Sequence, residues 1–269
     1  MRHIKKLLTG VAVAAMVAFV ACDNEATTEK DDNIPTTPIQ EMCYTPEKTS
    51  FELWAPTAES AVVRLYNGDE LAEVVAMQRG DKGLWSAEVE GDKKSMYYTF
   101  QVSVDGNILK ETAGIFARAL DVNGNRGAII DMRDTDPEGW SEDKRPAVDP
   151  TEIVIYEMHY RDMTAHESAG SSNPGKYIAM AERGTRSHEG LATGIDHLRE
   201  MGVTHIHLLP TADFGSIDES RPTNQYNWGY EPRTTTPPRV HTQPTPPTPR
   251  RASASLRPLL RLCTMRAYA

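Results

Sequence analysis

The sequence has little cysteine and no cluster of potential metal ligands. Cysteine occurs only at positions 22, 43 and 263 of 269 residues, which is neither a disulfide framework nor the spacing of a zinc site. His205 and His207 share one face of a predicted strand, but no third ligand is near them in the sequence, so we interpret them as core or loop-anchoring residues. The sequence therefore predicts neither a metal centre nor a cofactor.

Negatively charged residues are absent from the C-terminal part of the sequence. Residues 233–269 contain no Asp, Glu, Lys or Gly, but seven Arg and seven Pro. The whole chain has a formal net charge of −9, so removing these seven positive charges leaves a net charge of −16 on residues 1–232. An acidic body of this kind argues against nucleic acid as the main partner. Taken alone, the tail has two interpretations. It is a natural basic arm that binds nucleic acid or an acidic surface, or it is a segment translated in the wrong reading frame.

The N-terminus has the pattern of a targeting segment. Three basic residues precede the apolar run Leu7–Val20, which is too short to span a membrane comfortably. The run ends in Ala21-Cys22, which resembles the lipobox of bacterial lipoproteins. We predict a lipoprotein signal peptide over 1–22, lipidation of Cys22 and attachment to the membrane of the bacterial cell envelope. An ordinary secretory signal or a short membrane anchor is the alternative.

The next residues divide into a polar segment and a strand-rich domain. Residues 23–41 are polar without aromatic side chains and predict a disordered tether. Residues 42–135 hold short alternating segments that are separated by Gly- and Asn-containing turns, a pattern typical of a small antiparallel sandwich. The predicted strands are Phe51–Pro56, Ala61–Tyr66, Leu84–Val89 and Tyr97–Val104.

This strand-rich domain also resembles a known module. Phe-x-x-Trp-Ala-Pro-Thr-Ala at 51–58 and the run from Asp121 to Asp131 are similar to the opening and close of the carbohydrate-binding sandwich that precedes the catalytic barrel in pullulanases and branching enzymes. Trp54 and Trp85 could stack on sugar rings. Because both lie within predicted strands, we favour core packing for both.

The pattern changes after a polar linker at 136–150. Within residues 151–232, the continuous apolar run Ile153–Tyr156 predicts a strand buried on both faces. Gly190–Gly202 has helical spacing and a glycine stop, and Val203–Pro210 predicts a second buried strand. Strand, helix and strand form one β/α unit. The fold class is thus an all-β, carbohydrate-binding-module-like sandwich followed by the truncated start of a (β/α)8 TIM barrel.

One heptapeptide carries most of the functional signal. Residues 226–232 read Tyr-Asn-Trp-Gly-Tyr-Glu-Pro and follow the second predicted strand, where loops of a barrel build the active site. Its aromatic rings offer flat apolar faces for glucose, and an amide can bind hydroxyl groups. Packing of an aromatic loop over the barrel rim would produce the same composition.

The heptapeptide resembles the signature Tyr-Asn-Trp-Gly-Tyr-Asp-Pro of type I pullulanases, with Glu231 in place of Asp. The segments 155–164 and 190–210 likewise resemble the first strand, first helix and second strand of the α-amylase clan. The resemblance implies that Tyr230 stacks on the sugar beside the scissile bond and that Tyr226, Asn227 and Trp228 bind substrate.

Catalysis by this clan requires carboxyl groups that follow later barrel strands. Retaining glycosidases use two of them, about 5–5.5 Å apart. The clan's later motifs do not occur in this sequence, so the sequence predicts no catalytic residue. For Glu157 and Asp162 we favour structural hydrogen bonding over an acid pair.

The tail fits a change of reading frame after Pro232. Codons that encode Thr234–Val240 also encode Asn-Tyr-Asn-Thr-Pro-Glu-Gly when read one base earlier. Carried to the end, the other frame permits a direct continuation of a type I pullulanase, with an amphipathic helix after the second strand. We therefore interpret residues 233–269 as a frameshifted, disordered Pro/Arg-rich tail.

The sequence is compatible with two functions. The first is an N-terminal portion of a type I pullulanase, which debranches α-1,6-glucosidic linkages of pullulan, starch or glycogen and is inactive in this truncated form. The second is a glucan-binding or silent surface lipoprotein without catalysis. The expected partners are an α-glucan polysaccharide and, through a lipid anchor at Cys22, the membrane, and nucleic acid is not expected.

Overall fold

The computed structural model describes residues 34–144, 147–212, 215–220 and 226–232. The predicted signal peptide with Cys22, residues 23–33 of the predicted tether and the predicted frameshifted tail lie outside the described residues. In the part of the chain that is described, no helix is long and apolar enough to cross a membrane.

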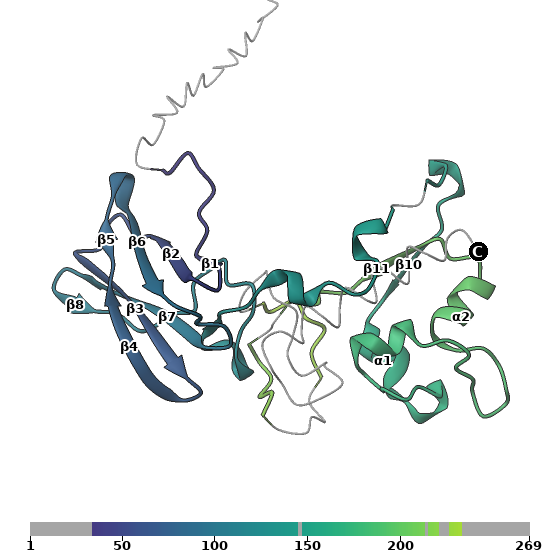
Figure 1. The fold of residues 1–269 in the computed structure, drawn as a ribbon. Coiled ribbons are helices and arrows are strands. Elements are labelled where there is room, and N and C mark those ends of the chain that lie inside the picture. The colour runs from purple at the N-terminus through teal and green to yellow at the C-terminus, as the bar shows by residue number, and fades with distance from the viewer. Residues whose placement is uncertain (1–33, 145–146, 213–214, 221–225, 233–269) are drawn as a thin grey trace, which may run out of the picture. The chain divides into compact units, whose positions relative to one another are not determined.

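Two antiparallel sheets form the domain predicted at 42–135 (Figure 1). The first has the strand order β1-β2-β6-β5, and the second has the order β4-β3-β7-β8 with β9 added beside β7. The strands are β1 (Met42–Tyr44), β2 (Lys48–Trp54), β3 (Ser60–Asn67), β4 (Glu70–Ala76), β5 (Gln78–Arg79), β6 (Leu84–Glu90), β7 (Tyr97–Val104), β8 (Asn107–Ile108) and β9 (Gly127–Ala128).

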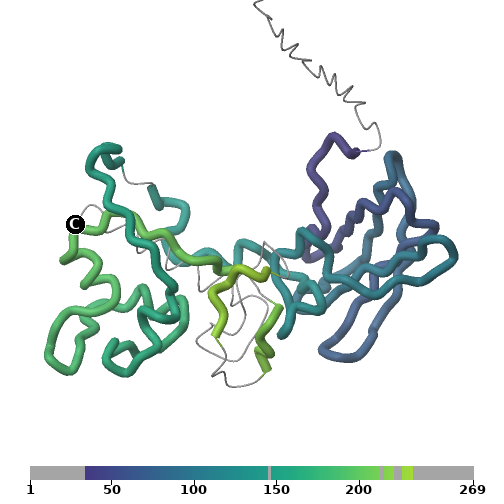
Figure 2. Tube along the Cα trace, turned by 180° about the vertical axis from the view of Figure 1, so that it is seen from behind, coloured from purple at the N-terminus to yellow at the C-terminus, as the bar shows by residue number. Residues whose placement is uncertain are grey.

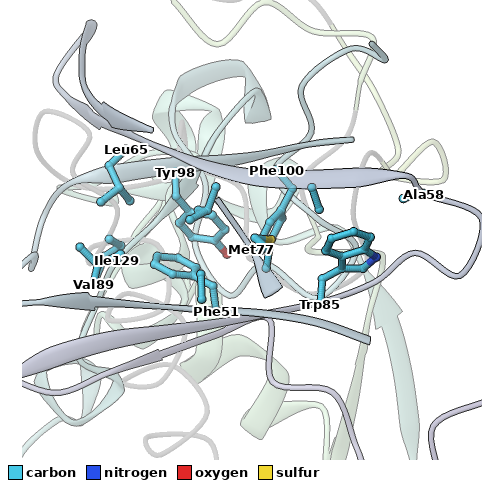
Figure 3. Packing of buried hydrophobic residues seen from close by; sticks show 12 residues of the cluster. Phe51, Ala58, Leu65, Met77, Trp85, Val89, Tyr98, Phe100 and Ile129 are labelled. Atoms are coloured by element: carbon cyan, nitrogen blue, oxygen red, sulfur yellow. The ribbon is translucent and has the colours of Figure 1, made fainter. Parts of the chain in front are cut away.

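The sandwich core consists of side chains that point inward from both sheets (Figure 3). Phe51 of β2 is fully buried, with its ring 5.3 Å from that of Tyr98 and 6.2 Å from that of Phe100 on β7. Val63 and Leu65 of β3 are equally buried. Because successive side chains of a strand point to opposite faces, every second residue of each strand faces inward. This alternation places the rings of Phe51, Tyr98 and Phe100 in one core.

All four strands predicted for the sandwich are present within a few residues of their expected limits. The predicted turns are also present, because Asn67-Gly68, Asp105-Gly106 and Asn123-Gly124 include positive φ angles at Gly68 (+59°), Asp105 (+50°) and Asn123 (+68°). β4 was missed. Leu71 and Val74 are 44% and 49% exposed on this edge strand, so no buried alternation marks it in the sequence.

The interpretation of the two tryptophans is right for one and wrong for the other. Trp85 is 5% exposed and donates its indole N–H to the Ala55 carbonyl at 3.0 Å. Trp54 is 39% exposed and donates to the Lys82 carbonyl at 2.9 Å. Phe51 faces the core, so the side chain three positions along the same strand must face outward.

The remainder of the described chain holds a parallel pair of strands, two short α-helices and several 3₁₀ turns. β10 (Ile155–Met158) pairs in parallel with β11 (His205–Leu208), with Tyr156 opposite Ile206. The helices are α1 (Tyr160–Ala165) and α2 (Gly194–Glu200). The 3₁₀ turns are Asp81–Gly83, Val122–Gly124, Met132–Thr135, Trp140–Glu142, Pro150–Glu152, Glu167–Ala169 and Tyr177–Ala181.

The β/α unit confirms the predicted order of strand, helix and strand but corrects its details. The helix begins at Gly194 rather than Gly190, and Leu191 is 68% exposed beside an isolated bridge between Arg186 and Ala192. Gly202, with φ +76°, follows the helix end as expected. The segment that resembles a barrel strand up to Thr164 is strand only to Met158, because α1 begins at Tyr160.

The prediction that both strands are buried on two faces is wrong. Met158 is 6% exposed and joins a core with Leu198 of α2, whereas Ile155 is 65% exposed on the opposite face. In this two-stranded parallel sheet α2 packs on one face, and the described residues form no hydrophobic cluster on the face that carries Ile155, although parallel sheets are usually covered on both faces.

A buried carboxylate ties the start of the sandwich to a later loop. Glu41 is 5% exposed, and its two carboxylate oxygens accept the backbone N–H groups of Ile115 (3.0 Å) and Phe116 (2.7 Å). Burial raises the pKa of Glu41 above its usual 4.5 and outweighs these two hydrogen bonds, which lower it.

This carboxylate predicts a defined pH dependence of stability. Because the folded chain binds the Glu41 proton more readily than the unfolded chain, the contribution of Glu41 to the free energy of unfolding falls as pH rises from 4.5 through the raised pKa. In Glu41→Gln that component is absent. Urea unfolding of both proteins across this window should show the wild type losing stability relative to the variant as pH rises, and a constant difference would contradict the argument.

Candidate functional site

The heptapeptide at 226–232 passes close to the chain that leaves β11. Gly229 has φ +91°, and a Cβ atom there would lie 2.6 Å from the Pro210 carbonyl oxygen. Only glycine fits both the backbone angle and the close approach. Gly215 donates its backbone N–H to the Glu231 carbonyl at 3.1 Å, so segments 215–220 and 226–232 lie side by side, as their yellow-green traces show in Figure 2.

Tyr226 connects this loop to α1. Its hydroxyl group donates to Asp162 Oδ2 at 2.9 Å, and its ring centroid lies 6.1 Å from that of the buried His159. Trp228 meets the Tyr226 ring edge-on at 6.3 Å. Partial desolvation raises the pKa of Tyr226 above its usual 10.0, and the hydrogen bond to the Asp162 carboxylate adds a smaller shift in the same direction. The hydroxyl therefore stays protonated and remains a donor at neutral pH.

Both ends of the Asn227 amide are hydrogen-bonded, within the loop and to Ser216. Its Oδ1 accepts the Gly229 backbone N–H at 2.6 Å, and its Nδ2 donates to Ser216 Oγ and, at 3.4 Å, to Glu231 Oε2. The amide thus fixes the shape of the loop. Direct contact between Asn227 and a sugar stays a prediction.

The three aromatic side chains of the loop present their rings to solvent. Tyr226, Trp228 and Tyr230 are 55%, 59% and 62% exposed, although the loop is held at one end by the bond of the Tyr226 hydroxyl to Asp162 and at the other by the bond of the Glu231 carbonyl to the Gly215 N–H. Exposed large aromatic groups on a fixed backbone are typical of a binding surface, because a preordered surface loses little conformational entropy on association. Their faces suit the apolar faces of glucose rings.

The other candidate residues have structural partners. Glu157 Oε2 lies 3.0 Å from His207 Nδ1 across the paired strands, and His205 Nδ1 lies 2.9 Å from Thr204 Oγ1. His207 is exposed, so its interpretation as a core residue is wrong. The structural interpretation of Asp162 is confirmed by its bond to Tyr226. No group of three potential metal ligands occurs within the described ranges.

Two residues of the site were not anticipated for their present roles. Ser216 contacts the motif amide, and His159 packs against Tyr226. Ser216 lies in an irregular segment whose sequence has no periodic signal. His159 directly follows β10, so its position at the carboxyl end of a parallel strand was the one available clue.

Comparison with known proteins gives matches over both parts of the chain. Residues 38–114 match Carbohydrate-binding module 48 (Isoamylase N-terminal domain). A pullulanase of Bacillus subtilis (strain 168) is 38% identical over 189 residues, which are 70% of this chain and 26% of that protein. Pullulanase 1 of Arabidopsis thaliana chloroplasts is 33% identical over 194 residues, which are 66% of this chain and 19% of that protein.

Solved structures that resemble the chain are also pullulanases. The pullulanase of Paenibacillus barengoltzii in complex with maltohexaose and α-cyclodextrin has a TM-score of 0.84 at 36% identity, over 91% of this chain and 38% of that one. The type I pullulanase of Bacillus subtilis complexed with maltose has a TM-score of 0.80 at 33% identity, over 88% of this chain and 33% of that one. The chain therefore spans about a quarter to two fifths of these bacterial pullulanases.

The sandwich, the β/α unit and the sequence and structure matches together indicate the class of protein. In both parts the chain is similar to pullulanases, which are glycoside hydrolases, and its residues 38–114 match carbohydrate-binding module 48. More narrowly, its described residues correspond to the N-terminal portion of a type I pullulanase. The predicted all-β sandwich and the β/α unit behind it are thereby confirmed.

Proposed function

We propose that the chain supplies the glucan-binding N-terminal portion of a debranching enzyme for α-1,6-glucosidic linkages of pullulan, starch or glycogen. The observation that carries this proposal is the loop 226–232, which holds three exposed aromatic rings, with the Tyr226 hydroxyl bound to Asp162 and the Glu231 carbonyl bound to the Gly215 N–H. It is supported by the relatives, since pullulanases of Paenibacillus barengoltzii are known in complex with maltotriose, maltotetraose and maltohexaose.

Catalytic inactivity of this chain, and its attachment to the cell envelope, belong to the same proposal. The carboxyl groups that hydrolyse the bond would come from later barrel strands, so the chain binds glucan without cutting it. Cys22 would be lipidated and would hold the chain at the membrane.

A glucan-binding surface lipoprotein without catalysis is the second candidate. The match of residues 38–114 to a carbohydrate-binding module favours it, because such a module can act without a catalytic centre. The two candidates share the ligand and differ in whether hydrolysis ever accompanies binding.

Calorimetric titration of the full chain tests the proposal. We expect binding of maltohexaose with a Kd of about 10 μM to 1 mM, and no binding of cellohexaose, because stacked aromatic rings read the curvature of an α-linked chain. Incubation with pullulan should release no maltotriose. Absence of maltohexaose binding would contradict the proposed ligand, and release of maltotriose would contradict the predicted inactivity.

A further inference from the structure

A reciprocal hydrogen-bonded contact joins a turn near the end of the sandwich to the segment beside the motif loop. The backbone N–H of Asn123 donates to Glu219 Oε2 at 3.0 Å, and the backbone N–H of Glu219 donates to Asn123 Oδ1 at 2.7 Å. Asn123 Nδ2 also donates to Asp218 Oδ1 at 3.1 Å. We call this set of three bonds between Asn123 and residues 218–219 the Asn123 clasp.

The turn that presents Asn123 is rigidly built. Asp121 accepts the backbone N–H groups of Asn125 (2.7 Å) and Arg126 (2.9 Å) with one oxygen and the Arg126 guanidinium (2.9 Å) with the other. Asp121 is only 7% exposed, so these charge-assisted bonds are little weakened by solvent. The geometry holds Asn123 at φ +68°, a conformation that asparagine tolerates.

The clasp is anchored on its other side as well. Glu219 is 7% exposed and Ile217 is 5% exposed, so residues 217–219 are packed rather than free at the surface. Ser220 contributes by donating its backbone N–H to Asp218 Oδ1 at 3.0 Å, which fixes the carboxylate that Asn123 contacts.

From the clasp, a short chain of contacts leads to the aromatic loop. Ser216 lies two residues before Asp218 and contacts Asn227 Nδ2. Gly215 donates to the Glu231 carbonyl at 3.1 Å. Segment 215–220 therefore bridges the Asn123 turn and the loop that carries Trp228, while Tyr226 is held independently by Asp162.

We propose that Asn123 is a positioning residue for the aromatic loop 226–232. It fixes segment 215–220, which in turn fixes Asn227 and Glu231 and so sets where Trp228 and Tyr230 meet the sugar. The sandwich then acts as a structural support for the glucan site in addition to any binding of its own. The effect on glucan affinity rests on the proposed function, whereas the clasp itself does not.

Hydrogen exchange on the full chain tests the clasp without reference to sugar. Asn123→Gly keeps the left-handed turn and removes the side-chain bonds. We expect amides of 215–220 and 226–232 to exchange about tenfold faster in this variant, with exchange in β2, β6 and β7 unchanged, because only a local opening becomes easier. Maltohexaose affinity should fall by about threefold or more in the same variant.

Asp105→Gly is the matched control, because Asp105 also has a positive φ, of +50°, in a turn of the same sandwich. It should leave exchange of 215–220 at the wild-type rate. Glu219→Gln retains an acceptor for the Asn123 N–H and should preserve most of the protection. Glu219→Ala loses that one bond but keeps the two bonds of the Asn123 side chain, so it should accelerate exchange less than the double variant with Asn123→Gly, which lacks all three.

Each outcome decides between alternatives. Equal exchange of segment 215–220 in wild type and Asn123→Gly, or equal acceleration by Asp105→Gly, would overturn the clasp. Faster exchange without a change in maltohexaose affinity would overturn the positioning role but leave the clasp. Faster exchange in a chain that binds no maltohexaose at all would instead overturn the proposed function.

Discussion

Replacing Trp228 with alanine is expected to weaken maltohexaose binding by at least tenfold, a loss of about 1.4 kcal/mol or more. Trp228 is 59% exposed and offers the largest ring of the motif. The variant removes the ring that we propose to stack on the sugar, and it also removes the edge-on contact with Tyr226 at 6.3 Å, which helps to hold the Tyr226 ring in place. Isothermal titration of the full chain with maltohexaose measures the change.

Trp54→Ala is the appropriate control for this result. Trp54 is also a partly exposed tryptophan, 39% exposed at the end of β2, and its indole N–H is satisfied by the Lys82 carbonyl. We expect its removal to change maltohexaose affinity less than about twofold, within the range usual for a contact outside the binding site. A tenfold loss with Trp54→Ala and none with Trp228→Ala would place the glucan site on the sandwich and contradict our assignment.

Replacing Phe51 with alanine should have the largest effect on stability. The ring is fully buried between the two sheets, in contact distance of Tyr98 and Phe100 (Figure 3). Loss of a buried phenylalanine removes its transfer free energy and leaves a cavity, which together cost about 3–5 kcal/mol. Urea unfolding followed by near-ultraviolet circular dichroism should show a correspondingly lower midpoint for the sandwich.

Phe116→Ala provides the comparison at an exposed position. Phe116 belongs to the same sandwich region but is 49% exposed, so its removal should change the free energy of unfolding by less than about 0.5 kcal/mol. Similar losses for Phe51→Ala and Phe116→Ala would mean that the core is not where the structure places it.

The sandwich was largely predictable because its signal is local. Strands such as Tyr97–Val104 alternate at period two, and turns such as Asn67-Gly68 carry residues suited to positive φ. β4 was missed because an exposed edge strand needs no apolar alternation. Trp54 was assigned to the core because strand membership does not say which face a residue occupies until the register is known.

The site was predictable only in part. The identity of the aromatic loop follows from the order of its residues, but its supports do not. Asp162 and Asn123 lie 64 and 103 positions before Tyr226, the first motif residue, and a single sequence gives no record of such distant contacts. The engagement of Asn227 with Ser216 likewise depends on how segment 215–220 is placed, which tertiary contacts decide.

Direct contact between an exposed ring of the motif loop and α-glucan can be observed at the indole groups. The chain has four tryptophans, and their indole N–H groups give separate nuclear magnetic resonance signals that Trp→Phe variants can assign. On titration of the full chain with maltohexaose, we expect the Trp228 signal to shift and saturate, while the signal of Trp85, whose indole N–H is bound to the Ala55 carbonyl within the core, stays in place. A stationary Trp228 signal at a maltohexaose concentration that moves any other indole signal would contradict it.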